Sequence, residues 1–255
     1  MAQLSLYRPG SSPLHKLNPL TKLAVMACCL GAAFGFPNPY WVVGFYLLFT
    51  LSLAAWGGML KPFLVQNAKL ILPFFLSLFI IQGFFYGGAT VLFPLGPFSY
   101  TLEGVEVAFG FTVRILQAIA GMTLFIFSTR PDHLMLALQK HGFPHQAMYL
   151  VVTTMQIIPQ FQNKALAILE AQQARGLETQ GNLIVRLKAL FPMVVPMILG
   201  SLIDIDERAI ALESRAFSKP GPKTSLIEIP DSETQKILRW CLVAAGLLLV
   251  VWRAL

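Results

Sequence analysis

The stretch LILPFFLSLFIIQGFFYGGATVLF, residues Leu70–Phe93, contains no Asp, Glu, Lys or Arg. A helix of about 20 mostly apolar residues is long enough to cross the hydrocarbon core of a bilayer. Three further runs of this kind occur at Leu20–Phe36, Tyr40–Met59 and Val105–Phe127, and a shorter run lies at Ile237–Trp252. We therefore predict about five transmembrane helices.

The composition is typical of a membrane protein. Of the 255 residues, 56% are apolar and only 12% are charged, and the mean hydropathy is +0.66. Soluble domains carry about 25% charged residues, so this chain lacks the charge to cover a water-facing surface. The segment Met1–Asn18 is polar and has no apolar core, which argues against a secretory signal. The predicted fold class is all-α, a polytopic protein of the lipid bilayer.

The basic residues indicate an orientation. A net charge of +7 could suggest nucleic-acid binding, but the cytoplasmic loops of membrane proteins also hold an excess of Lys and Arg. If the N-terminus and the segment Pro131–Lys236 are cytoplasmic, the inner side accounts for all 19 basic residues except Arg114 and Arg253. We then expect the C-terminus outside the cell membrane and no nucleic-acid partner.

A long segment separates the fourth predicted span from the fifth. Helix-start and helix-stop signals in it predict three long amphipathic helices. The first begins near Asp132 and ends before Gly142, the second covers His145–Ala174, and the third covers Leu183–Phe217. We predict that these helices pack on the cytoplasmic face of the membrane.

The main alternative topology has seven spans. The runs Ala147–Phe161 and Ala189–Ile203 are apolar, but at about 15 residues each they are short for a span. Counting them as spans would place basic residues such as Lys164 and Arg175 outside, against the expected charge distribution. With five spans, the chain divides into a membrane region (1–128), a cytoplasmic coupling region (129–222), and a linker with the last span (223–255).

The second and third predicted helices end in similar motifs, EAQQARG at Glu170–Gly176 and ALESRAF at Ala211–Phe217. Each places an arginine between two small residues, which would let a partner surface approach the backbone closely. The fork-shaped guanidinium could then bind a carboxylate or carbonyl groups on that partner. The candidate coupling residues are Ala174, Arg175, Gly176, Ser214, Arg215 and Ala216.

A simpler interpretation of each motif stands beside this one. A small-Arg-small tripeptide is common, and an arginine near the end of a helix interacts favourably with the helix dipole. The occurrence of two such motifs at the ends of successive helices, at Arg175 and Arg215, favours a shared role in binding.

Several stretches together resemble the transmembrane T component of energy-coupling factor transporters, the EcfT/CbiQ family. The opening YRPGSSPLHKLNPLTKL, Tyr7–Leu23, matches the N-terminal pattern of that family. Gly142–Pro144, Ile158–Pro159 and Phe191–Pro196 also fit it. The two arginine motifs resemble the family signature; the first has the full Ala-Arg-Gly form, whereas the second reads Ser-Arg-Ala and departs from it.

The resemblance implies a non-catalytic subunit of an ATP-driven importer in a prokaryotic cell membrane. In that family the arginine-bearing helices are coupling helices, which bind two ABC-type ATPase subunits, one at Arg175 and one at Arg215. The spans hold a membrane-embedded substrate-binding S component, whose cargo is a vitamin or a transition-metal ion. The resemblance implies no cofactor, and it implies that ATP hydrolysis occurs in the partner subunits.

Other candidate sites have weaker patterns. The string Pro220–Ser225 lacks the second glycine of a phosphate-binding loop and does not follow a strand. A break at Gly142–Pro144 separates His133 and His141 from His145, which argues against a metal site. We expect the charged cluster Asp204–Arg208 to form ion pairs rather than to act as an acid and base.

Two other classes of function remain open from sequence. A self-contained channel or secondary carrier would gather polar groups at the bilayer midplane, but the spans offer Gln82, Arg114, Gln117 and little else. An intramembrane enzyme would need a His, Asp or Glu constellation within the spans, and the predicted spans contain none. Charge within a span is a candidate for function by default, so Arg114 needs a partner.

Overall fold

The computed structural model describes residues 10, 12–95, 98–178, 181–219, 221 and 230–254. The chain forms two compact units, one of Ser5–Gly142 with Ile229–Leu255 and the other of Met1–Leu4 with Phe143–Glu228. The start of the N-terminal pattern, residues 7–9, and most of the string Pro220–Ser225 lie outside the described residues.

The first unit is a helical bundle, and the predicted all-α fold is confirmed. A two-stranded antiparallel hairpin, β1 (Val91–Leu95) and β2 (Phe98–Thr101), is the one exception among the described residues. The helices of this unit are α1 (Pro13–Lys16), α2 (Pro19–Gly35), α3 (Pro39–Phe45), the π-helical turn η1 (Tyr46–Thr50), α4 (Leu51–Trp56), α5 (Leu60–Phe85), α6 (Leu102–Ser128), α7 (Pro131–Gln139) and α10 (Glu233–Ala254).

Five helical segments of the described chain are long and apolar enough to cross a membrane, and four of them overlap predicted spans. They are Pro39–Trp56, Leu60–Phe85, Leu102–Ser128, Ala189–Ser214 and Glu233–Arg253. The first predicted span, α2, has only 17 residues, or about 26 Å of helix, which is at the lower limit for crossing hydrocarbon. The protein is therefore polytopic, and α9 satisfies the length criterion that α2 narrowly misses.

The predicted third span was wrong at both ends. The expected connection Gly57–Lys69 is helical from Leu60 onward, because α5 accommodates its polar residues. The Asn67 side chain, for example, is buried and donates a hydrogen bond to the Phe63 carbonyl at 3.0 Å. At the other end α5 stops at Phe85, and the following apolar residues form the hairpin rather than more helix.

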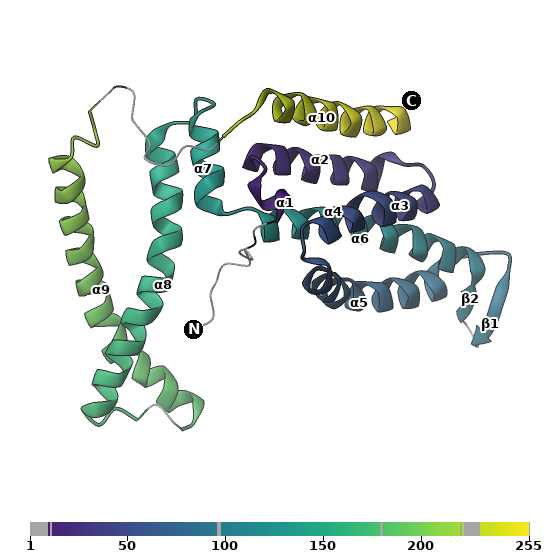
Figure 1. Ribbon diagram of the computed structural model, residues 1–255. Helices are drawn as coiled ribbons and strands as arrows, with labels where there is room; N and C mark the ends of the chain where they lie inside the picture. Colours follow the sequence, from purple (N-terminus) through teal and green to yellow (C-terminus); the bar gives the residue numbers. More distant parts are fainter. Residues whose placement is uncertain are drawn as a thin grey trace. The chain divides into compact units, whose positions relative to one another are not determined.

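Helix α2 packs against both α10 and α6, as Figure 1 shows. Gly31 and Gly35 lie one turn apart on the face of α2 that meets α10. A Cβ atom on Gly31 would lie 2.7 Å from the carbonyl oxygen of Gly246 in α10, and one on Gly35 would lie 2.7 Å from Leu249. Membrane helices associate through such small residues because they allow the backbones to approach closely.

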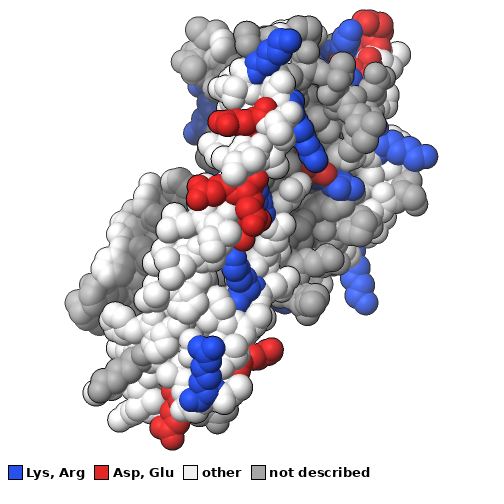
Figure 2. All heavy atoms as spheres, turned by 90° about the vertical axis from the view of Figure 1, so that its left-hand side faces the viewer, with Lys and Arg blue, Asp and Glu red and all other residues white. Residues whose placement is uncertain are grey.

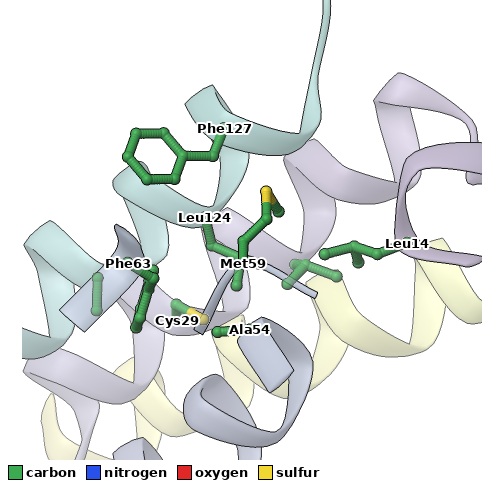
Figure 3. Packing of buried hydrophobic residues seen from close by; sticks show 9 residues of the cluster. Leu14, Cys29, Ala54, Met59, Phe63, Leu124 and Phe127 are labelled. Carbon is green, nitrogen blue, oxygen red and sulfur yellow. The ribbon is translucent and has the colours of Figure 1, made fainter. Parts of the chain in front are cut away.

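A hydrophobic cluster joins five helices: α1, α2, α4, the start of α5 and the last turns of α6. Leu14, Cys29, Met59, Phe63 and Phe127 are all at most 6% exposed and belong to one cluster. Figure 3 shows these side chains gathered between the helices, with Met59 near Leu124. The four-residue helix α1 is thus anchored to the bundle by Leu14.

Buried polar side chains hold the same end of the bundle together. The Lys22 ammonium donates to the carbonyl of His15 at 2.9 Å and to that of Ser128, the last residue of α6, at 2.7 Å. The Asn18 side chain caps α2, and its backbone N–H donates to the Gln235 side chain of α10 at 2.9 Å. Because buried polar groups need partners, these contacts explain how the polar residues Asn18 and Lys22 of the N-terminal pattern can be buried in the bundle.

The start of α7 is fixed by an ion pair between neighbours. The Arg130 guanidinium donates to both carboxylate oxygens of Asp132, at 3.2 and 2.8 Å. Burial by itself would raise the pKa of the Asp132 carboxyl, but the hydrogen bonds and charge of Arg130 lower it below its usual value. Helix α7 (Pro131–Gln139) lies close to the predicted bounds, but it belongs to the same unit as the membrane bundle.

The close contact of α2 with α10 can be tested with a matched pair of substitutions. Gly31→Ala should lower the free energy of unfolding by about 1–3 kcal/mol, because the new methyl group meets backbone atoms that must move. Gly44→Ala, where nothing lies within 4 Å of the added atom, should be neutral or slightly stabilising. Thermal unfolding of the purified protein in detergent measures both, and equal melting temperatures for the two variants would contradict the contact.

Candidate functional site

The second unit is built on two long helices, α8 (His145–Ala174) and α9 (Leu183–Ser214). The predicted bounds of α8 are confirmed. Helix α9 ends three residues earlier than predicted, because Arg215 is already its C-cap.

The two helices run in opposite directions and cross, as Figure 1 shows. At the crossing the Lys164 ammonium forms an ion pair with Asp204 at 2.8 Å. Gly200 leaves room for this lysine, since a Cβ atom there would lie 2.9 Å from its Nζ. One turn away, the Arg208 guanidinium donates to the Gln160 side chain at 2.6 Å. The pairing role expected for the Asp204–Arg208 cluster is thus confirmed for Asp204.

Further contacts extend the pairing toward both ends of α8. The Gln172 side chain donates to the carbonyl of Pro192 at 3.3 Å. At the opposite end of α8, the Phe217 ring lies 5.1 Å from the His145 ring and 4.8 Å from the Tyr149 ring, measured between centroids. The residues just after α9 therefore lie beside the first turns of α8.

The backbone around Arg175 ends α8 in a Schellman motif. Arg175 is the C-cap, with φ −88°, and Gly176 follows with φ +90°. The Gly176 N–H donates to the Gln173 carbonyl at 2.9 Å, and the Leu177 N–H donates to the Gln172 carbonyl at 3.0 Å. This pair of reversed hydrogen bonds defines the motif, and it requires a residue in the left-handed conformation directly after the cap.

The second motif has the same backbone geometry. Arg215 is the C-cap of α9, with φ −91°. The Ala216 N–H donates to the Glu213 carbonyl at 2.9 Å, and the Phe217 N–H donates to the Leu212 carbonyl at 3.0 Å. Ala216 has φ +55° and is the one non-glycine residue with positive φ in the described chain. The two arginines therefore occupy equivalent positions despite the different letters of their motifs.

This geometry changes the explanation of the small residue after each arginine. The sequence suggested that small residues flank the arginine so that a partner can approach closely. The structure shows a second requirement, because a side chain at Gly176 or Ala216 must adopt the left-handed region that glycine tolerates best. In the sequence, this motif could have been recognised from two similar helix ends, each with a small residue directly after the arginine.

Both guanidiniums are exposed. In the part of the chain that the structure describes, no hydrogen bond or ion pair engages the side chain of Arg175 or Arg215. Arg175 follows the last residue of α8, whereas Arg215 lies next to the residue that packs on the first turns of α8. The 30 residues of α8 span about 45 Å, so the two arginines lie near opposite ends of one helix.

The α8 and α9 unit also presents a broad apolar surface. Figure 2 views the molecule from the side of α9 and shows scattered acidic and basic side chains on a largely uncharged face. Large apolar side chains of α9 are more than half exposed, among them Phe191, Val195, Leu199 and Leu202. Exposed apolar surface of this extent indicates contact with lipid or with another protein.

The other candidate sites do not come together. Among the described residues, no group of three or more His, Cys, Asp or Glu side chains is placed to hold a metal ion. Gln117 is fully buried in the bundle and forms a hydrogen bond with Thr50 at 3.1 Å. Arg114 donates to the carbonyl of Pro37 at 2.9 Å, a partner that no sequence pattern could reveal.

Together the apolar bundle and the two arginine-capped helices define a multi-pass membrane protein that presents a matched pair of basic contacts. A family model described as CbiQ, cobalt transport protein, matches residues 10–226. The chain therefore belongs to this family of transporter membrane components, and the resemblance to the T component of energy-coupling factor transporters is confirmed.

Curated proteins of the same kind cover nearly the whole chain. The energy-coupling factor transporter transmembrane protein EcfT of Thermosediminibacter oceani is 26% identical, over 96% of this chain and 94% of its own length. Its namesake from Exiguobacterium sibiricum is 28% identical over 96% of each chain. A third, from Ruminiclostridium cellulolyticum, is 28% identical over 88% of this chain and 86% of its own.

The equivalence of the two caps predicts opposite effects from two small substitutions. Gly176→Ala should destabilise the end of α8 by about 1–2 kcal/mol, because alanine resists the left-handed conformation. Ala216→Gly should stabilise the end of α9 by up to about 1 kcal/mol for the same reason. Hydrogen exchange of the capping amides of residues 176–177 and 216–217 measures both. Changes of the same sign at the two sites would show that the caps are not equivalent.

Proposed function

We propose that this protein is the coupling subunit of an energy-coupling factor importer. In this role it transmits the ATP-driven movement of two cytoplasmic ATPase subunits to a membrane-embedded S component. The observation that carries the proposal is the pair of equivalent caps that present Arg175 and Arg215 from one crossed helix pair.

The two arginines suit a partner with two similar docking sites. An exposed guanidinium offers a planar fork of donors that matches carboxylates and carbonyl groups. Two such groups, about 45 Å apart by the length of α8, fit two subunits of an ABC-type ATPase dimer, whether identical or different. The small residues Ala174 and Ser214 precede the arginines, and both are exposed, which leaves the approach to each arginine open.

The crossing of α8 and α9 supports transmission of force between the two sites. The Lys164–Asp204 ion pair, the Arg208–Gln160 hydrogen bond and the Phe217 ring contacts join the helices at separate points along their lengths. A displacement of one arginine would therefore move the other end of the pair as well. The exposed apolar face of α9 supplies a surface on which an S component or lipid can pack.

The proposed orientation follows the basic residues. With the N-terminus and the α8 and α9 unit on the cytoplasmic side, the coupling arginines face the compartment that contains ATP, and the C-terminus lies outside. ATP hydrolysis belongs to the partner subunits, and the S component selects the cargo, a vitamin or a transition-metal ion. The coupling region, 129–222, then lies between the four-span region and the last span.

A self-contained channel or secondary carrier is the second candidate. It needs polar groups that are free to line a path through the bundle. Gln117 instead pairs with Thr50, and Arg114 donates to a backbone carbonyl, so both side chains already have a partner within the bundle. Substrate uptake by the purified chain alone in liposomes, without ATP or other subunits, would favour this alternative.

The docking role predicts that Arg175→Ala and Arg215→Ala each weaken ATPase association about tenfold or more, as expected for lost hydrogen bonds to a charged group. The double variant should abolish uptake, and Lys should substitute poorly because it lacks the fork. Co-purification with the ATPase subunits and ATP-dependent uptake in liposomes measure these effects.

Lys219→Ala provides a matched control, since Lys219 is an exposed basic residue four positions after Arg215. It should leave association and uptake unchanged. Melting temperatures of the arginine variants should equal that of the unaltered protein, because both side chains are exposed. Full ATPase association and uptake in the double arginine variant would overturn the docking role.

A further inference from the structure

Two basic residues that the proposed orientation does not place on the inner side, Arg114 within a span and Arg253 near the outer end of the last span, bind the same end of α2. Arg114 lies near the middle of α6 and Arg253 lies in the last turn of α10. Both reach the C-terminal end of α2. The Arg114 guanidinium donates to the carbonyl of Pro37 at 2.9 Å, and the Arg253 guanidinium donates to that of Phe34.

Within the described residues, no ion pair compensates the positive charge at this end of the bundle. The C-terminal end of a helix carries partial negative charge, which attracts the two guanidiniums but does not neutralise two full charges. Within the described residues, neither arginine forms an ion pair with a carboxylate. The two guanidiniums donate to carbonyls three residues apart in the chain, and Nη1 of Arg114 is buried with no hydrogen-bond partner among the described residues.

An apolar groove runs between α2 and α10 toward the same arginines. It has a volume of about 290 Å³ and an almost wholly apolar lining. Gly31 and Gly246 form part of its lining, at the place where the backbones of the two helices are in close contact. At helical spacing, the lining positions lead along α2 toward Phe34 and along α10 toward Arg253. The lining includes Ala27, Leu30 and Gly31 of α2 and Gly246, Leu247 and Val250 of α10.

Aromatic side chains mark this level of the bundle as a membrane interface. Tyr40 and Trp41 begin α3, directly after the Pro37 loop, and Trp252 precedes Arg253. All three are highly exposed, at 74%, 65% and 65%. Tyrosine and tryptophan are enriched where the hydrocarbon meets the headgroups, which favours a position of the arginine pair near lipid phosphates.

We propose that this groove binds an anionic phospholipid, with an acyl chain along the line where α2 meets α10 and the phosphate on Arg114 and Arg253. Arginine forks match phosphate oxygens with paired hydrogen bonds, and an anionic lipid supplies the charge that the described residues do not. A second copy of the chain or a partner helix would fill the apolar part of the groove but would leave the paired positive charge unmatched.

Lipid retention by the full-length protein tests this site. The purified chain, washed in detergent and offered phosphatidylglycerol or phosphatidylcholine, is analysed by native mass spectrometry. We expect about one retained phosphatidylglycerol per chain and a clear preference over phosphatidylcholine. Arg114→Gln with Arg253→Gln should lower retention about tenfold or more. Ala27→Trp, which fills the groove from an exposed position, should lower it as well.

Lys61→Gln is the matched control, because Lys61 is exposed at the start of α5, and it should retain lipid normally. Added phosphatidylglycerol should raise the melting temperature of the unaltered protein but not that of the double arginine variant, because only a bound ligand stabilises the fold. This comparison separates loss of the site from loss of folding.

Three results would overturn the proposal. The first is equal retention of the two lipids by the unaltered protein, and the second is undiminished phosphatidylglycerol retention in both the double arginine and the Ala27→Trp variants. The third is a crosslinker at Leu247, on the groove wall, that captures protein instead of lipid. None of these results depends on ATPase docking, so the lipid site and the coupling function stand or fall separately.

Discussion

A bilayer core contains no water to pair with backbone N–H and C=O groups, and this constraint underlies most of the structure. Each stretch at membrane depth must satisfy its own backbone, which a helix does along its length. Helices in lipid gain little from burying apolar side chains, so close packing and buried hydrogen bonds hold them together. The glycines between α2 and α10 and the Thr50–Gln117 pair are examples of these two forces.

The same need for hydrogen-bond partners shapes the candidate coupling site. The last carbonyl groups of a helix have no partner within it, and both α8 and α9 provide one through reversed hydrogen bonds from the residues after the arginine. This arrangement fixes the backbone at Arg175 and Arg215 while their side chains stay exposed. A structural solution for ending a helix thus also holds two guanidiniums in matching positions, ready for a partner.

Much of the fold could be predicted because apolar runs and helix breaks are local signals. The bounds of α8 were predicted from the Gly142–Pro144 break and from Gly176. The prediction failed at the start of α5, which begins at Leu60 and pairs the buried Asn67 side chain with a carbonyl one turn earlier in the same helix. The partners of Lys22 and Arg114 could not be predicted either. Both side chains donate to backbone carbonyls, which every residue has, so the residue type does not reveal the acceptor.

Local sequence patterns were enough to predict that this protein lies in a membrane and that arginines end two of its long helices, because hydropathy and helix-stop residues act over a few turns. The three-dimensional fold alone shows which spans pack together and that Ala216 adopts a left-handed conformation, as Gly176 does. It alone brought Arg114 and Arg253, distant in sequence, to one end of α2 beside an apolar groove. Those features depend on contacts between residues far apart in the chain, which no local pattern encodes.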